Sequence, residues 1–247
     1  IRLGTAQQIK ERHNFQWIID ILLLGGFLIM ALYHIVLYLL RPDDRSTLYF
    51  AALTGIFAVR ILVTGNVYFT ILFPKVAWEW LYTVELLTLT LGPPLFMLLL
   101  LSLYQGLLWK PIQYLIYGVG ALFGLAAIFL PARISSYLVT PNQIILLVTL
   151  ICCITILCRA LKRKESGAGI ILGGFGFLFL TVFHDILNAN KFFYNIQLAA
   201  FGWFALIISQ SFVLSLRFSN AFKTAEKLTG ELKERNIALS RLNRLKD

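Results

Sequence analysis

The chain has 247 residues, of which 59% are hydrophobic and only 14% are charged. Soluble domains have about 45–50% apolar and about 25% charged residues, so a soluble enzyme, a disordered chain and a disulfide-stapled secreted module are excluded. In so apolar a chain the net charge of +10 indicates membrane topology and anionic lipid, not nucleic acid. Cys152, Cys153 and Cys158 lack metal-ligand or redox spacing and are interpreted as buried small hydrophobes.

Seven segments are long and apolar enough to cross a bilayer, whose hydrocarbon core of about 30 Å requires roughly 20 helical residues. Lipid offers no partner for an unpaired backbone group, so the segments must be helices. The sequence therefore predicts an all-α membrane protein with seven transmembrane helices. The expected spans are residues 17–40, 48–69, 80–104, 111–130, 142–161, 167–188 and 198–216.

The distribution of basic residues predicts the orientation of these spans. Fifteen of the 22 Lys and Arg lie in segments on one side of the membrane, six lie on the other side, and Arg60 lies inside a span. Because positive charge stays on the cytoplasmic side, we expect the N-terminus outside and the C-terminus inside. Tryptophans near the predicted span ends are expected to anchor at the headgroups; they are Trp17, Trp78, Trp80 and Trp109.

The C-terminal tail, residues 217–247, contains eight basic and four acidic residues and one largely apolar row. Intervals in this row alternate between three and four, which is the heptad spacing of a coiled coil. A polar residue in such a seam fixes register at a cost in stability. We therefore expect a cytoplasmic coiled-coil helix that forms a homodimer. The predicted dimer seam consists of Ala221, Ala225, Leu228, Leu232, Arg235, Leu239 and Leu242.

The tail has an alternative interpretation as one amphipathic helix lying on the inner leaflet. Its apolar stripe is narrow, follows a period of 3.5 and is interrupted by Arg235, which favours the coiled coil. No proline separates the last span from the tail. Residues 198–247 are therefore expected to form one unbroken helix of roughly 75 Å at 1.5 Å per residue, which can carry motion from the bilayer to the cytoplasm.

Several polar side chains lie inside the predicted spans, where ionisable groups are costly enough to be functional hypotheses. We expect Arg60 to pair with Glu85 or Asp185 around a pocket open to the outside. Such a pair is either a fixed interhelical link or part of a site for a ligand or a proton. Asp20 and Glu79 are expected only to reach the headgroups. The predicted polar cluster consists of Arg60, Glu85, His184, Asp185 and Asn188.

Two further patterns concern packing and chemistry. Pro93 and Pro94 lie inside the third span and predict a bend, because proline removes a helical hydrogen bond. Glycine pairs at 120/124 and 169/173 permit close helix approach. The sequence contains no nucleophile motif, zinc motif or phosphate loop. We therefore expect no catalytic residue, metal or cofactor in this chain.

Local features of the chain resemble a known receptor family. They are residues 1–5, and Tyr33 to Tyr38 followed by the short turn at 41–46. The first is similar to the exit of the extracytoplasmic sensory domain, and the second to the opening hairpin, of the bacterial seven-transmembrane receptors with diverse intracellular signalling modules. The resemblance implies an inner-membrane receptor. Residues 1–16 would end the sensory domain, 17–216 would form the membrane domain, and 217–247 would be a coiled coil leading to an output domain.

The last residues, Leu239 to Asp247, are similar to the linker before the phosphoacceptor helix of sensor histidine kinases. This similarity implies two-component signalling, in which an unknown extracytoplasmic ligand controls a kinase. Other members of the family carry cyclase or phosphatase outputs, so these remain alternatives. A small seven-span transporter is a further alternative, with its site at a broken helix near residues 92–94.

Overall fold

The computed structural model describes residues 6–64, 68–190 and 198–244. Within these residues the chain is helical, and seven of its helices are long and apolar enough to span a membrane. Three short helices, α3 (Phe69–Leu72), α6 (Ala132–Ser135) and the 3-10 helix η1 (Ser136–Leu138), lie between them. The long helices are α1 (Ala6–Leu40), α2 (Arg45–Val63), α4 (Trp78–Leu103), α5 (Lys110–Phe129), α7 (Val139–Lys162), α8 (Ala168–Ala189) and α9 (Ala199–Arg244).

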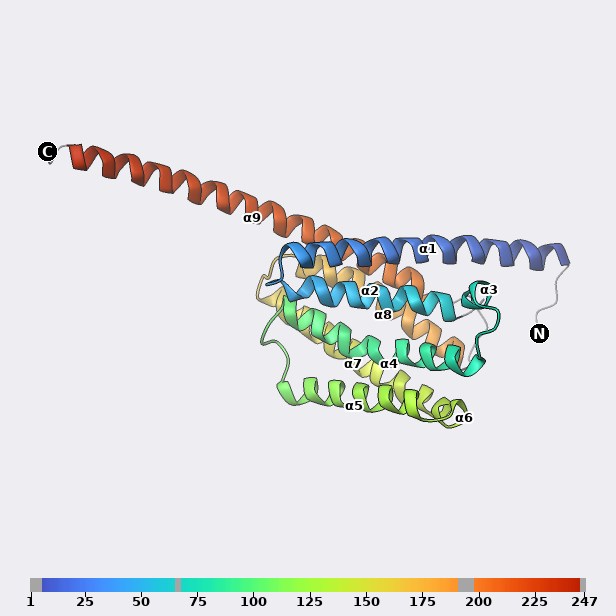
Figure 1. The fold of residues 1–247 in the computed structure, drawn as a ribbon. Helices are drawn as coiled ribbons and strands as arrows, with labels where there is room; N and C mark the ends of the chain where they lie inside the picture. The colour runs from blue at the N-terminus through green and yellow to red at the C-terminus, as the bar shows by residue number, and fades with distance from the viewer. Residues whose placement is uncertain (1–5, 65–67, 191–197, 245–247) are drawn as a thin grey trace.

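The long helices lie side by side in a bundle, with α1 and α5 on opposite sides (Figure 1). The start of α1 and the end of α9 point away from opposite ends of the bundle. We call the end where α1, α4 and α9 begin the N-terminal end, and the other the C-terminal end. In the predicted orientation, the N-terminal end faces out of the cell.

Apolar side chains fill the interior and also cover the outside of the bundle. Phe27, Met97 and Phe175 are buried, whereas Leu22 and Phe129 stand exposed on outward faces. Water would not tolerate so much exposed apolar surface, but lipid requires it. Trp78, Trp80 and Trp109 are also exposed beside helix ends, where interfacial anchors are found. The predicted all-α membrane fold with seven spans is confirmed.

The second span is shorter than predicted. Helix α2 ends at Val63, and the N–H of its C-cap residue Thr64 donates to the carbonyl oxygen of Arg60 at 2.9 Å. The predicted continuation to residue 69 is wrong, because Phe69 begins the separate helix α3. Arg60 therefore lies in the last turn of α2 and not in mid-span. A cation is favourable there because the helix dipole is negative at its C-terminal end.

Helix α4 runs as one helix through Pro93 and Pro94. On α5, a Cβ added to Gly120 would lie 2.9 Å from the Cγ of Pro94, so α5 approaches the prolines closely only because this residue is glycine. The expected close approach at the 120/124 pair is thus found at Gly120. Gly173, from the second pair, has nothing within 4 Å of an added Cβ.

Helix α9 belongs partly to the bundle and partly to the tail. It extends without interruption over 46 residues, about 69 Å at 1.5 Å per residue. Val213 is still buried, whereas the side chains from Ser219 to Ile237 are all exposed. The prediction that the last span and the tail form one helix is confirmed for residues 199–244. Pairing of two tails stays a prediction.

Helix α1 also extends beyond its predicted span. It begins at Ala6, so the predicted domain boundary between residues 16 and 17 falls inside a helix. The strand-like exit expected at residues 1–5 lies outside the described residues. The side chains of the seam residues Leu239 and Leu242 are likewise outside the described part.

Candidate functional site

A cavity of about 390 Å³ lies between α1, α2, α4, α7, α8 and α9. Small-molecule sites in proteins have volumes of about 300–1,000 Å³ and combine apolar walls with a few polar groups. The lining of this cavity fits that description. Its four ionisable lining residues are Asp20, Arg60, Glu85 and Asp185, and its polar residues include Thr64, Tyr82, Thr88 and Gln143. The cavity therefore collects the intramembrane charges near the N-terminal end of the bundle.

Arg60 connects α2 to the backbone of α4. Its Nη1 donates to Thr88 Oγ1 at 3.1 Å and to the carbonyl oxygen of Glu85 at 3.4 Å. The Thr88 hydroxyl donates to the same carbonyl at 2.7 Å. Among the described residues, no carboxylate lies within ion-pair distance of Arg60. The predicted ion pair is thus not formed. The guanidinium hydrogen-bonds to α4 instead, although Glu85 and Asp185 both attract it electrostatically.

Asp185, near the end of α8, caps the start of α9. Its Oδ1 accepts a hydrogen bond from the backbone N–H of Leu198 at 2.8 Å, and its Oδ2 accepts from the N–H groups of Leu198 at 3.0 Å and Ala199 at 2.8 Å. His184 Nδ1 lies 3.0 Å from the same Oδ1. The first N–H groups of a helix lack intrahelical partners, and a carboxylate there also complements the helix dipole. Asp185 thus links the cavity wall to the beginning of α9.

Asp20 lines the cavity instead of only reaching the headgroups. The hydroxyl of Tyr68 donates to Asp20 Oδ2 at 2.6 Å, and the ring of Trp17 packs edge-on against Tyr68 with centroids 5.2 Å apart. Tyr68 itself is buried. The expectation for Asp20 is therefore corrected, since a buried tyrosine holds its carboxylate inside the bundle. Glu79, in the first turn of α4, is exposed as expected.

Aromatic rings from four helices form one wall of the cavity. The rings of Phe57 and Trp203 lie 3.7 Å apart between centroids, Phe96 lies 5.7 Å from Trp203, and Phe27 lies 6.2 Å from Phe57. Trp203 belongs to α9, one turn after its start. The aromatic wall and the Asp185 cap thus both place the first turns of α9 at the cavity.

The structure brings together part of the predicted polar cluster. Arg60, Glu85 and Asp185 line the cavity, whereas His184 and Asn188 are not among its lining residues. His184 stands beside Asp185 with 21% of its side chain exposed. In the described part of the chain, no group of three His, Cys, Asp or Glu is arranged to hold a metal ion.

These features define a seven-helix membrane domain with a polar cavity at one end and a helix that continues from the cavity beyond the other end. The family model described as 7TM diverse intracellular signalling matches residues 16–217, so the chain belongs to this family. A search of the curated proteins and a search of the solved structures give no match. The chain is therefore a multi-pass membrane protein and a module for transmembrane signalling.

Proposed function

We propose that the cavity receives an extracytoplasmic signal and that α9 carries it to a cytoplasmic output domain of a bacterial inner-membrane receptor. The observation that carries this proposal is the position of Asp185. Its carboxylate lines the cavity and holds the first N–H groups of α9. A ligand that competes for this carboxylate therefore acts directly on the helix that leaves the bundle.

The transmission follows from the packing of α8 on α9. A Cβ added to Gly174 of α8 would lie 3.3 Å from the carbonyl oxygen of Ala205 and 2.8 Å from the Cβ of Ser209. A Cβ added to Gly202 of α9 would lie 2.9 Å from the Cα of Leu178. Packed interfaces switch between discrete arrangements instead of deforming continuously. Because the backbones of α8 and α9 are this close, a shift of one helix requires a matching shift of the other. A ligand shifts such arrangements when it binds one of them better.

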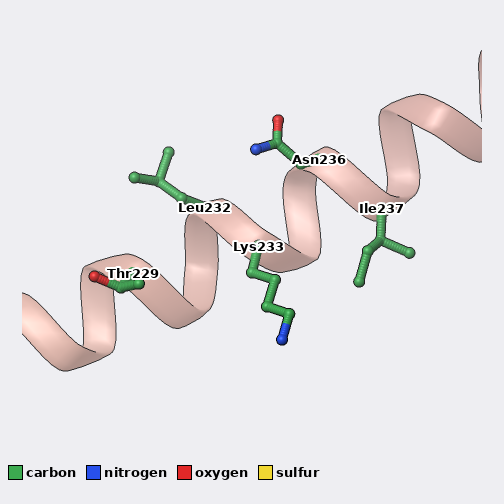
Figure 2. A pocket seen from close by; sticks show the side chains of 5 residues that line it. All are labelled: Thr229, Leu232, Lys233, Asn236 and Ile237. Carbon is green, nitrogen blue, oxygen red and sulfur yellow. The ribbon is translucent and has the colours of Figure 1, made fainter.

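The exposed tail supports pairing with a second copy of this chain. Leu228 and Leu232 are more than half exposed although they are apolar. A shallow depression beside Leu232 is lined by residues of α9 alone, and Leu232 and Lys233 point to different sides of the helix (Figure 2). A lone exposed helix with apolar residues at heptad spacing gains stability by pairing through that face. We propose a parallel homodimer through the seam defined above.

Disulfide crosslinking in membranes tests this dimer. Single cysteines replace Leu228, Leu232 or Leu239 in a variant without the three native cysteines, and Gly230 and Lys233 serve as matched positions off the seam. We expect strong dimer bands at the three seam positions and little at the two controls. Equal yields at all five positions would rule out a parallel seam.

We further propose that the output domain is a histidine kinase. The similarity of Leu239 to Asp247 to the linker before a phosphoacceptor helix supports this assignment. The whole gene product in inverted membrane vesicles should autophosphorylate on histidine with ATP. Cyclase or phosphatase activity without histidine phosphorylation would refute the kinase. The transporter alternative predicts a discontinuous helix near residues 92–94, whereas α4 is continuous there.

A further inference from the structure

The ionisable groups of the cavity differ in whether the protein supplies them with hydrogen-bond partners. Asp20 accepts a hydrogen bond from Tyr68, Asp185 accepts several from α9, and Arg60 donates to α4. The carboxylate of Glu85 has no hydrogen bond or ion pair with any described residue, although its backbone carbonyl has both Arg60 and Thr88 as donors. Glu85 is therefore the one lining carboxylate, within the described residues, whose oxygens are left for an occupant of the cavity.

The balance of charge in the cavity favours a cation. Three carboxylates and one guanidinium line it, so its formal charge is negative when all four groups are ionised. A carboxylate without a partner at membrane depth is costly. A positively charged group bound beside Glu85 removes that cost and balances the excess of carboxylates. The guanidinium of Arg60 attracts Glu85 electrostatically, but its Nη1 donates to the backbone carbonyl and to Thr88 and not to the Glu85 carboxylate. One guanidinium also leaves two of the three carboxylate charges unbalanced.

The aromatic wall indicates what kind of cation fits. The faces of aromatic rings attract cations, with tryptophan the strongest, and Trp203 stands in contact with Phe57 and Phe96 beside the cavity. Tyr82 lies one turn before Glu85 on α4 and also lines it. Apolar rings accommodate the carbon skeleton of an organic ligand, and a primary ammonium supplies three N–H donors to a carboxylate that lacks any.

We infer that the cavity binds a small organic amine in its ammonium form, with Glu85 as the counter-ion and the Trp203–Phe57 wall around its apolar part. This inference rests on the proposed receptor function and names the ligand class for the same cavity. Because Trp203 belongs to α9, an amine seated there contacts the output helix directly. Occupancy of the cavity and the position of α9 are then linked through one side chain.

The test uses the full chain in lipid nanodiscs and measures binding by calorimetry. The probe is 2-phenylethylammonium, and the matched controls are its neutral isostere 2-phenylethanol and the anion 3-phenylpropionate. We expect the ammonium to bind at least tenfold more tightly than either control. Glu85→Gln should weaken its binding at least tenfold, whereas Glu79→Gln, an exposed change on the same helix, should leave it unchanged.

A second variant separates loss of the charge from misfolding caused by substitution at residue 85. Glu85→Asp keeps the charge and should keep the preference for the ammonium over the alcohol. The inference is overturned if the three probes bind alike, if none binds, or if Glu85→Gln binds the ammonium as well as the native chain does. Those outcomes leave the receptor function standing, because that function is tested separately by crosslinking of the tail and by the Asp185 variants below, without any amine.

Discussion

Replacing Asp185 with alanine should loosen the start of α9 while leaving the rest of the bundle folded. The substitution removes both carboxylate oxygens that accept hydrogen bonds from Leu198 and Ala199. The N–H groups at the beginning of α9 then lack a partner, because an alanine side chain accepts no hydrogen bond. The contact between Gly174 and α9, two to three turns away, does not involve Asp185 and should persist.

The size of the effect follows from the contacts that are lost. Removing a helix cap costs about 0.5–2 kcal/mol, and hydrogen bonds to a charged group contribute about 1.5–3 kcal/mol. Asp185 caps two N–H groups and its side chain is only 18% exposed, so water screens it incompletely. We expect a loss of about 2–3 kcal/mol in the local stability of the first turn. Since 1.4 kcal/mol corresponds to a factor of ten, amide exchange there should accelerate about 30- to 150-fold.

Hydrogen–deuterium exchange measured by mass spectrometry in nanodiscs reports this change directly. The informative peptides contain the amides of Leu198 and Ala199. Asp44→Ala is the matched control, because Asp44 caps α2 through the N–H of Ser46 at 3.1 Å and its side chain hydrogen-bonds to Ser46 and not to α9. It should accelerate exchange at the start of α2 only. If Asp185→Ala leaves exchange at Leu198 and Ala199 unchanged, Asp185 does not hold α9 and the proposed coupling is refuted.

Two other substitutions test the packing around the site by reversible unfolding in mixed micelles. Gly174→Ala should lower the free energy of unfolding by about 1–3 kcal/mol, because the added Cβ overpacks the contact with α9. Gly173→Ala, with open space around the added Cβ, should be neutral or stabilise by up to about 1 kcal/mol. Equal effects of the two substitutions would contradict the close approach of α8 to α9. Tyr68→Phe should lower the free energy of unfolding by about 1.5–3 kcal/mol through the lost hydrogen bond to Asp20, and Tyr114→Phe, an exposed change, should cost little. A Tyr68 variant as stable as its control would argue against a stabilising hydrogen bond between Tyr68 and Asp20.

The spans were predictable because a helix that crosses the bilayer must be apolar over the thickness of the hydrocarbon core. The error at α2 shows the limit of that signal. Val67, Tyr68 and Phe69 continue the apolar run, so an average over the window hides the helix-stop residues Gly65 and Asn66. Composition thus predicts that a segment enters the membrane, but not where hydrogen bonding ends the helix.

The ionisable residues of the candidate site could be chosen from their position along the predicted spans. Arg60, Glu85 and Asp185 stood out because ionisable residues in spans are rare, and the structure brings all three to one cavity. Depth does not specify which way a side chain faces around its helix. Asp20 was therefore placed at the headgroups, and Tyr68, its partner 48 residues away, gave no local signal.

The cap on α9 was hidden from sequence patterns for a related reason. Familiar capping motifs place the side chain within a few residues of the amides that it binds. Asp185 acts on amides 13 and 14 residues later, across the connection between two helices. Such a contact depends on how α8 and α9 pack. Only the three-dimensional arrangement therefore identifies Asp185 as the residue that joins the cavity wall to the start of α9.

The most direct test of signal transmission measures the tail while changing only the cavity end of α9. Spin labels at Lys233 report the distance between the two tails of the proposed dimer by pulsed electron paramagnetic resonance in nanodiscs, with Asp44→Ala as the control. We expect Asp185→Ala to shift this distance distribution relative to the native chain and the control to leave it unchanged. An unchanged distribution in Asp185→Ala, together with faster amide exchange at Leu198, would show that loosening the start of α9 does not reach the tail.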